Sequence, residues 1–208
     1  MALEQEVKLL VNGEDKLDLS LLQGLSVFSQ DEPYIEHLVS TYYDTPELLL
    51  SQQHLGLRMR RVNERYLQTV KTSGTVTNGL HQREEWEYEL ARSEWDLSTL
   101  RLTPLIDMID KPEIWSTLMP LFTTDFFREI VQLTLVDGTQ VELAYDHGEV
   151  IAGELRSKIH EIELELKSGD SEQLASIADL ICQQFDLTLS DTSKAKMGYN
   201  LFKKINND

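Results

Sequence analysis

The sequence has little of several features on which particular protein classes depend. Its 208 residues include one cysteine, Cys182, which excludes an intramolecular disulfide and a cysteine-based zinc site. With ten glycines and five prolines, the chain is neither collagen-like nor of low complexity. No apolar run reaches the roughly 18 residues that a transmembrane helix needs. The start, MALEQEVKLL, lacks the basic and apolar regions of a signal peptide, so we expect a cytoplasmic protein.

Positive charge is also scarce. Lys and Arg total 19 against 36 Asp and Glu, a formal net charge of −17. Such a field repels nucleic acid and anionic membranes, and we expect neither as a partner. A polyanionic ligand would need a local basic pocket or bound metal ions. No Gly/Ser/Pro-rich linker divides the chain, so we expect a single domain over 1–208.

Alternation of apolar and polar residues predicts about eight strands. We expect them at 3–11, 34–43, 54–62, 65–72, 81–90, 125–136, 139–147 and 149–167. Helical segments are expected at 15–25, 45–52, 171–185 and 192–205, with an irregular helical stretch over 93–122 and a connection over 74–79. Asp137-Gly138 signals a hairpin turn. This order predicts an α+β protein, a closed eight-stranded antiparallel β-barrel with flanking helices.

Several strands carry charge on one face and apolar residues on the other. Glu161, Glu163 and Glu165 share a face of the last strand. At about 5 to 7 Å and an effective dielectric constant of about 20, adjacent carboxylates repel by roughly 2 to 3 kcal/mol, which a partner cation would reverse. If helices cover the apolar faces, the charged faces line a polar lumen. A sheet with one solvated face gives the same alternation without any ligand, and this alternative stays open here.

A lumen that carries both carboxylates and cations suits a polyphosphate bridged by metal. Carboxylate oxygens hold hard divalent cations such as Mg²⁺. Arg and Lys bind phosphate oxygens, Arg often with two parallel hydrogen bonds. Such a substrate would meet the basic lumen and the metal, and would avoid the acidic outer surface.

The residues on these strands resemble those of the CYTH-domain proteins, the triphosphate tunnel metalloenzymes. Glu4-Gln5-Glu6-Val7-Lys8 matches the ExExK signature that opens this family. Further matches follow in order: Tyr42-Tyr43-Asp44-Thr45, Leu57-Arg58-Met59-Arg60, Gln68-Thr69-Val70-Lys71, Arg83-x-Glu85-x-Glu87, Arg128, Asp146, Glu161-x-Glu163-x-Glu165 and Ser193-Lys194. The resemblance covers nearly the whole chain and is strongest with the bacterial inorganic triphosphatases.

The resemblance implies a tunnel that binds a triphosphate with one or two Mg²⁺ or Mn²⁺ ions. The implied metal ligands are Glu4, Glu6, Glu85, Glu87, Asp146, Glu163 and Glu165. The implied phosphate-binding residues are Lys8, Arg58, Arg60, Lys71, Arg83, Arg128 and Lys194. The implied catalytic set is Glu165 and Glu87, which would position the attacking water, together with Lys8. The general base is not identified.

The implied activity is metal-dependent hydrolysis of tripolyphosphate to pyrophosphate and phosphate. The alternatives are an adenylyl cyclase or a thiamine or nucleoside triphosphatase of the same fold, and a non-catalytic polyphosphate-binding module. Some bacterial triphosphatases continue into a helical, His-rich CHAD domain. Because this chain stops at Asp208, we expect that it either lacks such a domain or is part of a longer protein.

Overall fold

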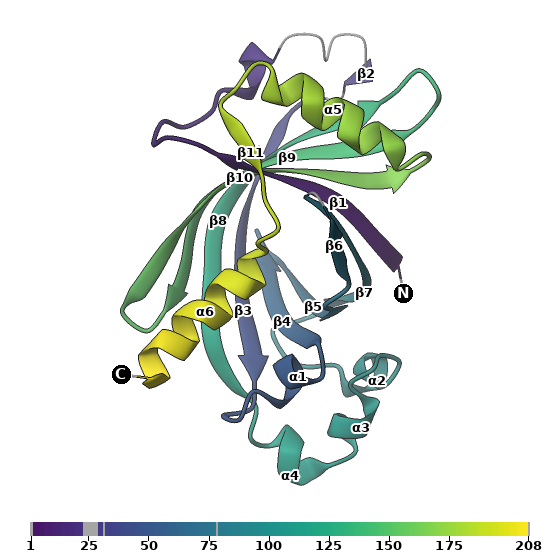
Figure 1. The fold of residues 1–208 in the computed structure, drawn as a ribbon. Coiled ribbons are helices and arrows are strands. Elements are labelled where there is room, and N and C mark those ends of the chain that lie inside the picture. Colours follow the sequence, from purple (N-terminus) through teal and green to yellow (C-terminus); the bar gives the residue numbers. More distant parts are fainter. Residues whose placement is uncertain (1, 23–28, 31, 78, 208) are drawn as a thin grey trace.

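Eight strands form a closed antiparallel ring. The computed structural model describes residues 2–22, 29–30, 32–77 and 79–207. Around the ring the order is β1 (Ala2–Val11), β10 (Leu155–Ser168), β9 (Gln140–Ala152), β8 (Met119–Thr134), β3 (Tyr34–Asp44), β4 (Leu55–Val62), β5 (Arg65–Thr72) and β7 (Leu80–Leu90). Pairing of β7 with β1 closes it (Figure 1). The predicted eight-stranded barrel is therefore confirmed.

Short strands and helices complete the molecule. β2 (Ser29–Gln30), β6 (Thr75–Thr77) and β11 (Leu187–Leu189) pair with β8, β7 and β1. The helices are η1 (Leu19–Leu21), α1 (Leu49–Gln52), α2 (Leu97–Leu100), α3 (Ile106–Ile109), α4 (Pro112–Trp115), α5 (Glu172–Cys182) and α6 (Lys194–Asn207). Figure 1 shows α5 across one side of the barrel and α1 to α4 gathered at the opposite end. No helix in the described part of the chain has the length and apolar composition needed to cross a membrane.

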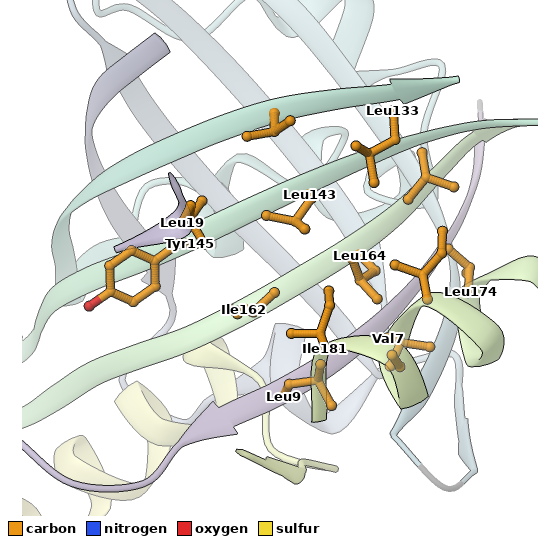
Figure 2. Close-up of a cluster of buried hydrophobic side chains, with 14 of the residues drawn as sticks. Val7, Leu9, Leu19, Leu133, Leu143, Tyr145, Ile162, Leu164, Leu174 and Ile181 are labelled. Carbon is orange, nitrogen blue, oxygen red and sulfur yellow. The ribbon is translucent and has the colours of Figure 1, made fainter. Parts of the chain in front are cut away.

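α5 covers the outer face of β1, β10, β9 and β8. Its apolar residues recur at helical spacing, and Leu174, Ile177 and Ile181 pack on outward-facing side chains such as Val7 and Leu9. Figure 2 shows Leu174 and Ile181 beside Val7 and Leu9. Burial of each such side chain contributes about 1.5–3 kcal/mol. Because side chains alternate along a strand, this packing directs the intervening charged residues of β1 into the barrel.

The other helices cover the remaining barrel surfaces differently. α1 to α4 pack on the outer face of β4, β5 and β7, where Leu57, Val70 and Trp86 are buried. α6 instead packs on inward-facing residues of β8 and its neighbours, among them Phe122. Gly198 permits this approach, because a Cβ there would lie 2.1 Å from the Phe122 ring. α6 thus fills one part of the lumen and carries Lys194 into it.

Several predicted boundaries are wrong. Residues 119–122 begin β8 and are not helical, although Pro120 suggested a break; Pro is tolerated near the start of a strand. Gly148 does not end a strand, because β9 continues through it to Ala152. It is a glycine because β8 passes close by: a Cβ at this position would lie 2.3 Å from the Asp125 carbonyl oxygen. The turn comes at Gly153, and β10 begins at Leu155. β6 occupies part of the predicted connection 74–79. A helix was expected over 15–25, and the described residues of this range contain only the three-residue η1. Residues 23–25 lie outside the described part of the chain.

Candidate functional site

A charged cavity of about 940 Å³ runs inside the barrel. Apart from Asp146, which is fully buried beneath its wall, every residue predicted to bind metal or phosphate lines this cavity. A solvated sheet face would leave these side chains exposed, whereas Glu6 and Lys8 are each 2% exposed. The alternative of a solvent-facing sheet without a lumen is therefore wrong.

The first cluster joins β1, β5 and β7. The Lys71 ammonium lies 2.8 Å from a Glu4 carboxylate oxygen and 3.1 Å from one of Glu85. Arg83 donates to Glu4 and, over 2.7 Å, to Glu6. Burial raises the pKa of Glu4, but Lys71 and Arg83 outweigh it and hold that pKa well below its usual range. Glu4 is therefore ionised, as a metal ligand or cation partner must be.

The second cluster centres on Arg58. One guanidinium nitrogen of Arg58 lies 3.3 Å from a carboxylate oxygen of Glu85 and 3.3 Å from one of Glu87. The Thr69 hydroxyl donates to Glu87 over 2.9 Å. Burial raises the pKa of Glu87, yet Arg58 and Arg60 bring it below its usual value. Arg58 thus bridges the carboxylates of Glu85 and Glu87.

The third and deepest cluster sets three carboxylates against three cations. Asp146, Glu161 and Glu163 come from β9 and β10, and one oxygen of each lies within 4.8 Å of the other two. The Lys194 ammonium lies 2.7 Å from Asp146 and 2.8 Å from Glu163, and it also donates to Glu161. This cage is of a size that holds a cation, and the Lys194 ammonium is the cation within it.

The other cations of this cluster arrive from neighbouring strands. Arg128 makes two parallel hydrogen bonds to Asp146, of 2.7 and 2.6 Å, and also donates to Glu163. The Lys8 ammonium donates to Glu163 and lies 3.2 Å from Glu6. Burial raises the pKa of Glu163, but the surrounding cations, Lys194 foremost, lower it well below its usual range.

Glu161 responds in the opposite direction. Burial is the largest effect and raises its pKa, Lys194 and Lys8 lower it, and Glu163 and Asp146 raise it again, so the pKa is raised overall. Sequence reasoning placed Glu161 on the charged face but left it out of the ligand set, which contained Glu163 and Glu165. The alternating sequence could have indicated Glu161 as a ligand, because it lies on the same face of the strand two residues before Glu163.

Glu165 lines the same cavity from β10. It pairs in register with Glu6, and its carboxylate lies 2.9 Å from the Lys167 ammonium. Burial raises its pKa. Glu85 and Glu87 are held by other cations, as described above. Among the described residues, Asp146, Glu161 and Glu163 form the one group of three or more acids with ligand spacing, and the predicted grouping of Glu165 with Glu85 or Glu87 stays a prediction.

Arg60 differs from the other lumen cations. Its Nε donates to the Ser40 hydroxyl over 2.9 Å, and within the described part of the chain it has no carboxylate within ion-pair distance. Burial, Arg58 and Arg128 lower the pKa of Arg60 to about 10. A partly buried cation that is repelled by its neighbours and lacks an acidic partner is a ready binding point for an anion.

Comparison with known proteins agrees with these features. A family model described as the CYTH domain matches residues 2–199. An inorganic triphosphatase of Haemophilus influenzae is 36% identical over 200 residues, which cover 96% of this chain and 56% of that protein. The chain therefore spans little more than half the length of this curated relative.

Two solved structures share the fold. One is a candidate adenylyl cyclase of Hippeastrum with a dominant triphosphatase activity, which is 20% identical, has a TM-score of 0.62 and aligns over 97% of this chain and 95% of that one. The other is a Pyrococcus horikoshii protein, 18% identical, with a TM-score of 0.53 over 96% and 99% of the two chains. At these identities the likeness supports the barrel architecture alone.

Proposed function

The chain belongs to the CYTH-domain family, and from this premise we propose that it is a metal-dependent enzyme that hydrolyses inorganic triphosphate to pyrophosphate and phosphate within the barrel. The observation that carries the proposal is Arg60, a partly buried lumen cation that has no acidic partner among the described residues. Around it, further cations line the same cavity. The relative from Haemophilus influenzae, itself named an inorganic triphosphatase, supports the same substrate.

The deep carboxylate cage supports the metal requirement. An ammonium group held by Asp146, Glu161 and Glu163 shows that the cage accepts a cation, and carboxylate oxygens are the ligands that Mg²⁺ and Mn²⁺ prefer. We propose these three acids as ligands, together with Glu4 and Glu6 from the adjoining strand. A bound divalent ion supplies neutralisation of phosphate charge and Lewis acidity. Glu85, Glu87 and Glu165 remain proposed ligands of a second ion.

The cations of the lumen bind and orient the triphosphate in this proposal. Arg60 binds a phosphate oxygen without breaking an internal ion pair. Arg58, Arg83 and Lys71 each exchange part of a carboxylate contact for a phosphate oxygen. Lys8, held at the centre by Glu163, keeps its charge beside the reacting phosphate. Positioning and charge stabilisation are the main sources of catalysis in phosphoryl transfer.

The attacking water needs an acceptor for its hydrogen bond. Glu87 and Glu165 both line the cavity, on different strands. Because burial raises the pKa of Glu165, this carboxylate takes up a proton closer to neutral pH than an ordinary glutamate does. We propose that Glu165 orients the water and that Glu87, held by Thr69, supports it from β7.

The inward-facing aromatic residues favour an inorganic substrate over a nucleotide. Tyr42 stacks on Phe122 with ring centroids 4.6 Å apart, and Tyr199 of α6 meets the Phe122 ring edge-on at 5.2 Å. These rings are engaged with one another. A nucleobase or a thiamine ring would have to separate them in order to stack.

Phosphate release from tripolyphosphate in Mg²⁺ or Mn²⁺ tests the proposal, with ATP and thiamine triphosphate measured beside it. We expect release from tripolyphosphate to be fastest, to stop in chelator and to be lost in Glu6→Gln. Glu84→Gln is the matched control, because Glu84 is exposed on the outer side of β7, and it should retain wild-type activity. No release from any substrate, while tripolyphosphate still raises the melting temperature, would contradict hydrolysis and leave either a binding module or a cyclase, which formation of a cyclic product from ATP would reveal.

A further inference from the structure

The Lys194 ammonium lies inside the carboxylate cage that is proposed above as a metal site. The ammonium contacts Asp146, Glu161 and Glu163 together, and the Lys194 side chain is 9% exposed. It also lies 5.0 Å from the centre of the Phe126 ring. A divalent ion bound by the same oxygens would have to displace this ammonium, because one cage cannot hold both.

We propose that Lys194 is a tethered cation that holds the carboxylate cage in the absence of metal and leaves it when a divalent ion binds, so that metal binding releases the first turn of α6. This inference rests on the proposed metal-dependent function. It concerns what Lys194 does before any triphosphate is present, a step separate from phosphate binding. Metal binding and docking of the α6 N-terminus are then linked, each weakening the other.

The position of Lys194 in the chain makes it the cation that can leave. Lys8 lies within β1, which pairs with β7 and β10, and Arg128 lies within β8, which pairs with β3 and β9. Lys194 is the first residue of α6, and residues 190–193 before it form neither helix nor strand. Ser190 and Asp191 are held by hydrogen bonds to Lys8, His81 and Gly79, so a movement confined to the residues that follow them withdraws the ammonium without breaking the barrel.

Electrostatics favours the exchange. A cation at a helix N-terminus is opposed by the positive end of the helix dipole, so the carboxylates are what hold Lys194 there. Burial lowers the pKa of Lys194, and Asp146 and Glu161 more than offset this by raising it. Once a divalent ion neutralises these acids, the attraction is lost, and repulsion from Lys8 and Arg128 remains. The freed ammonium already borders the cavity, where phosphate oxygens would arrive.

Hydrogen exchange of the wild-type chain tests the release without any substitution. The probe is Mn²⁺ alone, added to metal-stripped protein with no phosphate compound. The Met197 amide donates to the Ser193 carbonyl over 3.0 Å and closes the first turn of α6. We expect exchange at this amide to become at least about threefold faster with Mn²⁺, while the amides of α5 do not change. Unchanged or slower exchange, at an Mn²⁺ concentration shown to saturate the protein, would overturn the proposal.

Mn²⁺ affinity, measured by calorimetry in the absence of phosphate, tests the competition. Lys194→Met should bind Mn²⁺ about tenfold more tightly than the wild type, a difference of about 1.4 kcal/mol. Lys196→Met is the matched control, because it removes the same charge from an exposed position on the same helix, and it should stay within about twofold. Equal affinity of Lys194→Met and wild type would overturn the proposal.

A third variant separates competition at the cage from a general effect of charge. Lys71→Met removes a cation that contacts Glu4 and Glu85. A gain in affinity in Lys71→Met as large as that in Lys194→Met would overturn the specific role of Lys194.

Failure of the inference is distinguishable from failure of the proposed function. Metal-dependent phosphate release with unchanged affinity in Lys194→Met contradicts the inference alone, whereas absence of both Mn²⁺ binding and phosphate release in the folded wild type contradicts both.

Discussion

Replacing Arg60 with glutamine should make the protein more stable while weakening its hold on triphosphate. Burial and two neighbouring arginines lower the pKa of Arg60 to about 10. A base whose pKa is lower in the folded state opposes folding at every pH below that pKa, and this opposition fades as the pH rises from about 10 toward the ordinary value of about 12.5. At neutral pH the full cost is present.

The magnitude follows from that difference. Each pKa unit corresponds to about 1.4 kcal/mol, so the charge of Arg60 costs at most about 3 kcal/mol, and solvent in the cavity lowers this figure. The substitution also removes the hydrogen bond to Ser40, which contributes about 1 kcal/mol. We therefore expect Arg60→Gln to gain about 1 to 2 kcal/mol, which raises the melting temperature by roughly 2–8 °C in a chain of this size.

Thermal and urea unfolding of the phosphate-free protein measure the stability change, and tripolyphosphate titration measures the loss of affinity. Arg61→Gln is the control, since Arg61 is the next residue along β4 and is exposed. It should change stability by less than about 0.5 kcal/mol. An Arg60→Gln variant that is less stable than the wild type would refute the view that Arg60 is an unneutralised lumen cation.

Three further outcomes follow from the same contacts. Arg128→Gln leaves Glu163 and its neighbours short of a buried cation, so we expect a loss of about 3–5 kcal/mol in urea unfolding. Gly198→Ala places a methyl group against the Phe122 ring, and overpacking of this kind should lower stability by about 1–3 kcal/mol in thermal unfolding. Glu4 and Glu163 have lowered pKa values, so their stabilisation is present above about pH 4.3 and is lost on further acidification, and the urea midpoint should fall steeply below about pH 4.

Each of these has a control and a contrary result. Arg156 forms an exposed pair with Glu149 at 3.7 Å, and Arg156→Gln should cost less than about 1 kcal/mol; an equal loss in both arginine variants would contradict the buried cluster. Gly56→Ala has no atom nearer than 4.0 Å and should be tolerated, so equal effects at both glycines would argue against close packing of α6. A urea midpoint that rises steadily into acid would mean that the lowered carboxylate pKa values are wrong.

The barrel was predictable because its strands carry a local signal. Each long strand alternates apolar and charged residues, and that period shows in the sequence wherever one face is buried. The predicted strand boundaries are wrong where a proline or glycine, which often ends a strand, lies inside one because of its contacts in the folded protein. Gly148 read as a strand end, but it is a glycine because β8 passes close to it.

The sequence predicts which residues line the candidate site, but it does not predict which of them form ion pairs with one another. The ordered motifs placed the charged residues in one lumen, and the structure puts them there. The pairing of Lys194 with Glu161, and the absence of a carboxylate beside Arg60 among the described residues, depend on strand register and on where α6 docks. Residues more than 30 positions apart meet through those contacts, and no local pattern records them.

The sequence by itself determined the strands, the faces that would be buried and the residue types that would face the lumen, because alternation and side-chain chemistry are local properties. Only the tertiary structure decided which charges neutralise one another. Closing the ring sets β1 between β7 and β10 and brings α6 inside the barrel. The energy of a charge depends on its distance from its partners and on its burial, and both are set by that closure.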